Sequence, residues 1–121
     1  INLGENHLGR MNIEQTKALS AGLTFSTNLQ SLNFGYNDLN NMNVQQIQAL
    51  FTGLTQCKNL QALNLTYNYF CYMNAEQIQA LFTTLTQCKK LQSLNLTGNY
   101  ISNMNSEQND RIISKINKFN L

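Results

Sequence analysis

The sequence predicts an α/β solenoid in which a curved parallel sheet forms the concave side and helices form the convex side. The main observation is a repeat: the 31 residues from Leu29 to Asn59 return, with few changes, from Leu60 to Lys90. A second observation is that each copy contains a strand-like segment followed by a helical pattern. Repeats of this length are single supersecondary units that bury their apolar faces only against neighbouring copies.

Each unit opens with a short strand. In the segment from Leu60 to Leu65, Leu63 and Leu65 are two residues apart, and this spacing places both side chains on one face of a strand. Asn64 then points to the opposite face. Because a helical half follows each strand and leaves no room for a hairpin, the strands of successive units are expected to pair in parallel.

The second half of each unit predicts a helix. Apolar residues recur there at positions i, i+3, i+4 and i+7, as in an amphipathic helix. Asn74 can cap the first amides of one such helix, and Gln77 occupies the reciprocal capping position. Helices are about 10 Å wide and strands lie about 4.8 Å apart, so the stack is expected to bend with the sheet on the inside.

Four units form one array. The last one ends in a more polar segment that contains Asp110, Arg111 and Lys115, and we interpret this segment as a polar C-terminal cap. Because the sequence starts inside a repeat, we expect it to be a fragment of a longer chain, with an uncapped strand edge that favours self-association. The units are residues 1–28 (partial), 29–59, 60–90 and 91–121.

The unit resembles the leucine-rich repeat. The pattern L-x-x-L-x-L-x-x-N-x-[LFI] occurs at residues 29–39, 60–70 and 91–101. The long helical half is similar to that of the ribonuclease-inhibitor-like subclass, which is also found in cytosolic innate-immune sensors and in effectors of intracellular bacteria. The resemblance covers essentially the whole chain, although the period is a few residues longer than that subclass commonly shows and the sequence is rich in asparagine and glutamine.

The resemblance implies a structural role for one column of asparagines. Asn6, Asn37, Asn68 and Asn99 would form an asparagine ladder, in which buried amides satisfy backbone groups of the turns that leave the strands. An amide suits this role because it both donates and accepts hydrogen bonds. We therefore assign these residues to the fold and not to a binding site.

The outward-facing positions of the sheet and the tyrosines beside it are the candidate binding surface. Small and amide side chains leave the sheet flat, and the tyrosines add rigid amphipathic area of the kind enriched at protein interfaces. The alternatives are that the tyrosines only cover turns and that the asparagines form a solvated stripe. The candidate partner-binding residues are Asn33, Tyr36, Asn64, Thr66, Tyr67, Tyr69, Asn95 and Tyr100.

Composition excludes several function classes. A net charge of +2 with 12% charged residues lacks the dense basic face that nucleic acids or membrane surfaces require, so we expect neither as a partner. His7 is the one histidine, and the repeat geometry places no serine or cysteine beside it. With no glycine-rich phosphate loop and no zinc-ligand spacing, we expect no catalytic residue, no metal and no cofactor.

The cysteines favour a reducing compartment. Cys57 and Cys88 are repeat-equivalent and are expected to be small buried residues without a disulfide, whereas Cys71 is expected to be an exposed or partly exposed turn thiol. Three cysteines without metal-ligand spacing suggest a cytoplasmic protein or, following the resemblance to bacterial effectors, a secreted protein that acts in a host cytosol.

Two functions are therefore expected. The first is a non-catalytic protein–protein interaction module that binds a protein partner through the concave sheet and its tyrosine rim. The alternative is a structural or regulatory repeat segment that spaces or covers an attached domain.

Overall fold

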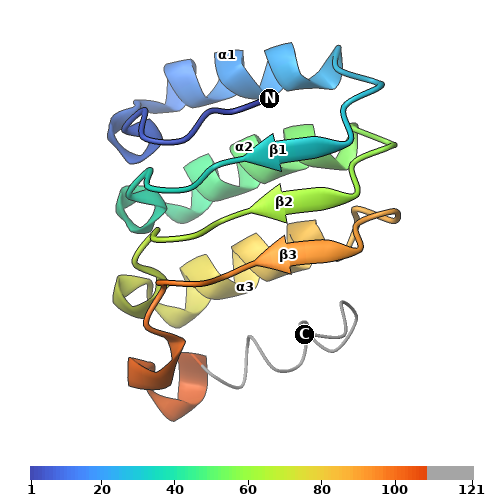
Figure 1. The fold of residues 1–121 in the computed structure, drawn as a ribbon. Coiled ribbons are helices and arrows are strands. Elements are labelled where there is room, and N and C mark those ends of the chain that lie inside the picture. Colours follow the sequence, from blue (N-terminus) through green and yellow to red (C-terminus); the bar gives the residue numbers. More distant parts are fainter. Residues whose placement is uncertain (109–121) are drawn as a thin grey trace.

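The computed structural model describes residues 1–108 and shows strand–helix units stacked in chain order (Figure 1). Three parallel strands pair in the order β1-β2-β3, and each residue pairs with its equivalent in the next unit, as Leu32 does with Leu63. In the first unit, Asn2 adds a single parallel bridge to Asn33. The strands are β1 (Ser31–Asn33), β2 (Ala62–Asn64) and β3 (Ser93–Asn95).

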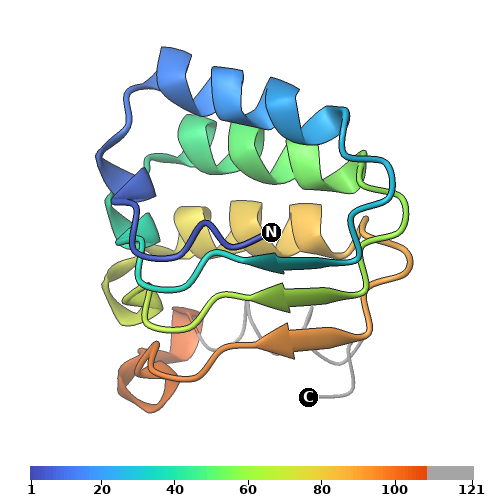
Figure 2. The same ribbon diagram turned by 45° about the horizontal axis from the view of Figure 1, so that its top comes forward.

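Three helices lie on one side of this sheet (Figure 2). Each begins with the predicted reciprocal cap: in α3, Asn74 Oδ1 accepts from the Gln77 amide at 2.8 Å, and Gln77 Oε1 accepts from the Asn74 amide at 2.7 Å. The same pair of hydrogen bonds joins Asn105 and Gln108, and the rest of the predicted C-terminal cap lies outside the described residues. The helices are α1 (Ile13–Thr24), α2 (Val44–Thr55) and α3 (Ala75–Leu85).

Short 3-10 helices, which the sequence did not lead us to expect, lie between each strand segment and the following α-helix. The residue before each of them has a left-handed backbone conformation, so the chain turns sharply at this point. These turns line one edge of the molecule in successive units. They are Leu8–Arg10, Leu39–Asn41, Phe70–Tyr72 and Ile101–Asn103.

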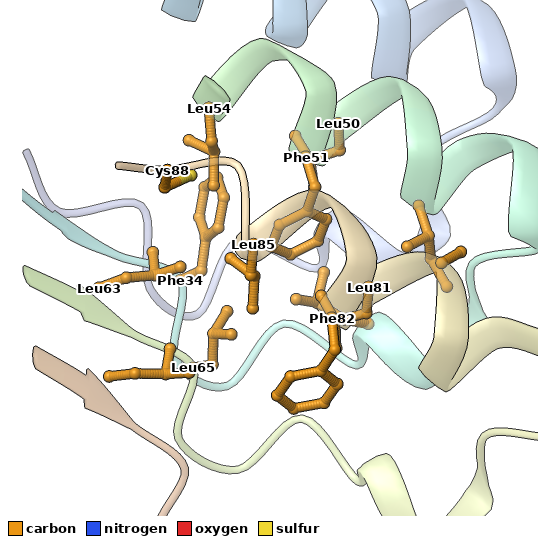
Figure 3. Close-up of a cluster of buried hydrophobic side chains, with 14 of the residues drawn as sticks. Phe34, Leu50, Phe51, Leu54, Leu63, Leu65, Leu81, Phe82, Leu85 and Cys88 are labelled. Atoms are coloured by element: carbon orange, nitrogen blue, oxygen red, sulfur yellow. The ribbon is translucent and has the colours of Figure 1, made fainter. Parts of the chain in front are cut away.

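The core lies between the sheet and the helices and runs through the whole stack (Figure 3). Leu63 of β2 and Leu81 of α3 are both buried. Phe34 and Phe51 meet edge to face, with ring centroids 6.3 Å apart and an interplanar angle of 77°. Burying one such large apolar side chain contributes roughly 1.5–3 kcal/mol, so the apolar columns supply most of the cohesion between units.

The asparagine ladder is confirmed for Asn37, Asn68 and Asn99, which are buried, whereas Asn6 in the partial first unit is exposed and is not the buried amide that we expected. Asn68 is buried, and its Nδ2 donates to the carbonyl oxygens of Phe34 at 3.0 Å and Leu65 at 3.0 Å. Its Oδ1 accepts from the backbone amides of Asn37 at 3.0 Å and Leu39 at 3.3 Å. One side chain thus connects two units through both ends of its amide, which is the structural role that the resemblance implied.

The cysteines lie where we expected them. Cys57 and Cys88 are buried, and Cys71 is partly exposed. The Cys57 thiol donates to the Leu23 carbonyl oxygen at 3.3 Å, and burial raises the pKa of this thiol. Among residues 1–108, no helix has both the length and the apolar character needed to cross a bilayer.

Candidate functional site

The asparagines on the outer face of the sheet are oriented by their own backbone. Asn33 Oδ1 accepts from the Gly35 amide at 2.7 Å, and Asn64 Oδ1 accepts from the Thr66 amide at 2.8 Å. Asn95 makes the same local hydrogen bond, to the amide of residue 97, at 3.0 Å. Each Oδ1 keeps a second lone pair and each Nδ2 group carries two N–H donors, so these amides can both donate to and accept from a partner.

A depression of about 340 Å³ lies on this face at the first three units. Four of the eight predicted partner-binding residues line this depression. Glu5 and the small residues at its bottom also line it, and we had not included them among the predicted residues. A side chain on Gly35 would place its Cβ 2.7 Å from Thr66 Oγ1, so glycine keeps the floor low at this point. The lining residues are Asn2, Gly4, Glu5, Asn33, Gly35, Tyr36, Asn64 and Thr66.

Thr66 contributes to this depression as part of its floor. Only 8% of the residue is exposed, because it packs beside Gly35 of the neighbouring unit. It therefore offers much less contact area than we expected when we placed it among the partner-binding residues.

The tyrosines form two groups along the rim. In the first group, the rings of Tyr36 and Tyr67 stack with centroids 4.5 Å apart and an interplanar angle of 14°. The Tyr67 ring also lies against Gly98, where an added Cβ would be 2.6 Å from it. Tyr36 is 51% exposed, whereas Tyr67 is half-buried, so Tyr36 presents most of the aromatic surface of this group.

The second group centres on Tyr69. Its ring lies near-parallel to those of Tyr72 and Tyr100, with centroid distances of 6.1 Å and 6.3 Å. Together with Cys71 and Asn103, these rings line a second depression of about 310 Å³. We had not predicted Tyr72, which is 74% exposed. The sequence does contain a signal for it, since polar residues occupy the equivalent position in the other three units.

The rim tyrosines occupy strained backbone positions. Tyr36, Tyr67, Tyr69 and Tyr100 have φ angles of 57°, 54°, 56° and 54°. Bulky residues rarely adopt this left-handed region, whereas glycine and asparagine adopt it at lower cost. Since this chain uses asparagine 20 times, the backbone alone does not explain tyrosine at four such positions. Strained residues of this kind cluster at ligand-contacting sites.

The surroundings of Tyr36 raise the pKa of its phenol. Partial desolvation is the main cause that raises the pKa of Tyr36, followed by its neighbour Tyr67, with a further contribution from Glu5. At neutral pH, therefore, the Tyr36 hydroxyl remains protonated and can donate a hydrogen bond.

The helix side of the molecule has a second candidate binding surface, which differs from the tyrosine edge in its side chains. A groove of about 390 Å³ lies between α2 and α3, and none of its lining residues is aromatic. Gln48 and Gln79 lie in this groove, and the Gln79 side chain bonds Thr83 Oγ1 at 3.3 Å. Within residues 1–108, no cluster of three or more histidine, cysteine or acidic side chains could hold a metal ion.

Comparisons with known proteins support the fold. The chain is similar to the crystal structure of the leucine-rich repeat-containing protein LegL7 from Legionella pneumophila, with a TM-score of 0.76 and 24% sequence identity. No protein-family model matches the sequence, and the search of curated proteins gave no match. The similarity covers 94% of this chain and 34% of the LegL7 chain, so the sequence corresponds to about a third of that protein's length. The chain has the leucine-rich repeat fold.

Proposed function

We propose that the chain is a non-catalytic protein-recognition module that binds a protein partner through the sheet face and its tyrosine rim. The observation that carries this proposal is the placement of all five tyrosines in two ring groups at one edge. Exposed tyrosines supply rigid contact area at low entropic cost, and they are enriched where proteins meet. Leucine-rich repeat folds generally serve as interaction scaffolds with an extended binding face.

The available area suggests a modest affinity. Four strand segments about 4.8 Å apart, each presenting about five residues with a rise of 3.3 Å, give a sheet face on the order of 300 Å². A standard complex uses about 800 Å² from each partner. The exposed tyrosines must therefore supply a large share of the interface, and further parts of the protein would strengthen binding.

The similarity to a Legionella protein extends the proposal to where the chain acts. We propose a reducing compartment, either the cytoplasm or, for a secreted effector, the cytosol of a host cell. In the part of the chain that the structure describes, Cys57, Cys71 and Cys88 form no disulfide, which is compatible with such a compartment.

The second candidate function is a repeat segment that covers an attached domain. Phe25, at the C-terminal end of α1, favours this candidate because 86% of it is exposed. In that case the surface that matters would be the outer side of α1 and not the tyrosine rim.

A capture experiment tests the first proposal. The 121-residue chain, immobilised, is exposed to an extract of its source cells or of their host, and the retained proteins are compared with those retained by two double variants. Tyr69→Ala with Tyr100→Ala removes two exposed anchors, and Gln48→Ala with Gln79→Ala changes the helix groove. Since an aromatic anchor often contributes about 2 kcal/mol or more, capture should weaken at least ~30-fold with the tyrosine variant.

Loss of capture with the glutamine variant alone would overturn the proposal, because binding would then depend on the helix side. Thermal unfolding of both variants serves as the control for folding. Capture of only the remainder of the same protein, independent of the tyrosines, would support the covering function instead.

A further inference from the structure

We propose that the depression on the sheet face binds an arginine side chain of the protein partner, with the guanidinium group lying on the Tyr36 ring beside the Glu5 carboxylate. This inference rests on the proposed function and names one anchor of the partner at the same surface. Three features carry it: the charge of the depression, the outer face of the Tyr36 ring and the hydrogen-bond acceptors of the floor.

The charge of the depression is negative. Glu5 is the charged residue among those that line it, and this residue is exposed. Within residues 1–108, no basic side chain forms an ion pair with its carboxylate. A partner that covers the depression removes water from this carboxylate, and a desolvated carboxylate without a counter-charge is costly. A cationic group of the partner removes this cost, whereas an anionic group increases it.

The Tyr36 ring offers one face for stacking beside this carboxylate. Glu5, Tyr36, Tyr67 and Gly98 occupy one column of the repeat, in this order. Tyr67 covers the Tyr36 ring on one side, with centroids 4.5 Å apart, so the opposite face of the ring lies on the side of Glu5. Glu5 is also near enough to Tyr36 to contribute to the raised pKa of its phenol. A guanidinium group stacks on aromatic faces and pairs with carboxylates, so one arginine can use both groups.

The floor supplies further acceptors. The Oδ1 atoms of Asn2, Asn33 and Asn64 each accept one backbone N–H, at 2.9, 2.7 and 2.8 Å, and each keeps a second lone pair. A guanidinium group carries five N–H donors and no acceptor. The donors that do not reach Glu5 can therefore bond to these oxygens. The Nδ2 groups of the same asparagines remain for backbone carbonyl oxygens of the partner on either side of the arginine.

The backbone at Glu5 supports a ligand-contacting role. Its φ angle is 60°, in the left-handed region that glycine adopts at the lowest cost. Gly98, at the end of the same column, has a φ angle of 78°. Glutamate is not among the residues that favour this region, so the turn alone does not explain a carboxylate at this position. Strained residues of this kind cluster at ligand-contacting sites.

Lysine and a glycan are the main competitors for this surface. The lysine ammonium group is a compact, strongly hydrated charge, and it has no plane to stack on the Tyr36 ring. The hydroxyls of a glycan can bond to the amides, but they supply no counter-charge for Glu5. The combination of an aromatic face, a carboxylate and amide oxygens therefore favours arginine.

The test is a titration of the ¹⁵N-labelled 121-residue chain with a capped Gly-Gly-Arg-Gly-Gly peptide. We expect saturable shifts of the side-chain amide signals of Asn33 and Asn64, and weaker binding at high salt because the carboxylate is exposed. The same peptide with citrulline in place of arginine keeps the planar group but lacks the charge, and it should bind at least about fivefold more weakly. The lysine peptide should also bind more weakly, and maltoheptaose should leave the signals in place.

Isosteric variants separate the charge from the fold. Glu5→Gln removes the charge and should weaken binding of the arginine peptide at least about fivefold. Glu76→Gln makes the same chemical change in the helix groove and should leave binding unchanged. Tyr36→Phe, which keeps the ring, should bind more tightly than Tyr36→Ala. Thermal unfolding of all four variants is the control for folding.

Four outcomes would overturn the inference: no shift with the arginine peptide, equal binding of the citrulline peptide, stronger binding of the lysine peptide or of maltoheptaose, or unchanged binding to the Glu5→Gln variant. If a protein is captured through Tyr69 and Tyr100 while the arginine peptide does not bind, the inference fails and the proposed function stands. If the arginine peptide binds as expected but no captured protein depends on the tyrosines, the arginine site stands and the proposed protein-recognition function fails.

Discussion

Gln77 makes contacts of two kinds, and both matter for the choice of residue. Its Oε1 completes the cap of α3, and its Nε2 donates to the Met42 carbonyl oxygen at 2.7 Å and to the Asn40 carbonyl oxygen at 3.2 Å. Gln46 reaches the Met11 carbonyl oxygen in the same way, at 2.7 Å. Glutamate would complete the cap equally well, so glutamine in this column reflects the bond to the preceding unit.

We predict that Gln77→Glu destabilises the fold by about 1–3 kcal/mol, because the Met42 carbonyl loses its donor and faces a carboxylate instead. The matched control is Gln15→Glu in α1, where the side chain is exposed and makes only the cap. That change should alter stability by about 0.5 kcal/mol or less. Urea denaturation of both variants checks the prediction, and equal losses would show that the bond between units contributes little.

At the scale of elements, glycine sets how closely neighbouring helices approach. Gly53 of α2 lies against Ser20 of α1, so that an added Cβ would be 2.3 Å from Ser20 Oγ and 2.9 Å from its backbone oxygen. The equivalent position in α3 is Thr84, which is buried and bonds the Leu81 carbonyl oxygen at 2.8 Å. This larger residue lies at the groove between α2 and α3.

Gly22 and Gly53 occupy the same repeat position, but replacing them with alanine is expected to change the stability of the fold in opposite directions. Gly22 of α1 has nothing within 4 Å of an added Cβ, so Gly22→Ala should stabilise the chain by about 0.5–1 kcal/mol through helix propensity alone. Gly53→Ala should instead destabilise it by about 1–3 kcal/mol, because the contact with Ser20 is overpacked. Thermal unfolding of the two variants is the measurement. A gain in stability for Gly53→Ala would contradict the close packing of α1 and α2.

The elements could be predicted from the sequence to different extents. The strands and helices followed from the repeat, since the columns of Leu63 and Ile78 carry clear periods of two and 3.6 residues. The 3-10 helices and the left-handed turns could not be predicted from the repeat, because the residues that adopt the left-handed conformation, such as Tyr69, do not favour it. Tertiary packing between units overrides local preference there.

The candidate site was only partly predictable for a similar reason. Asn33, Tyr36 and Asn64 were identified from their columns, and they do line one depression. The orientation of each amide depends on a hydrogen bond two residues along the chain, and the exposure of Thr66 depends on Gly35 of the neighbouring unit. A column pattern shows which residues share a face, but it does not show these contacts.

At the scale of the whole molecule, the units depend on one another. Leu63 lies between Leu32 and Leu94 in the sheet register, and all three are buried. Each unit contacts only its neighbours, so the stability of such a stack is the sum of unit and interface terms. With few units, the loss of one central interface removes a large fraction of the total.

The last prediction concerns this central interface. Leu63 of β2 and Leu81 of α3 belong to one buried cluster, on the sheet side and the helix side of the core (Figure 3). Replacing either by alanine should cost about 2–5 kcal/mol, as for other buried leucines that leave a cavity. Ile1→Ala, at a side chain that is largely exposed, is the control and should cost about 0.5 kcal/mol or less. Guanidinium denaturation gives the free energies of unfolding, and the slope with denaturant shows whether the stack still unfolds as one unit. Losses below about 1 kcal/mol for both leucine variants would be incompatible with a continuous core.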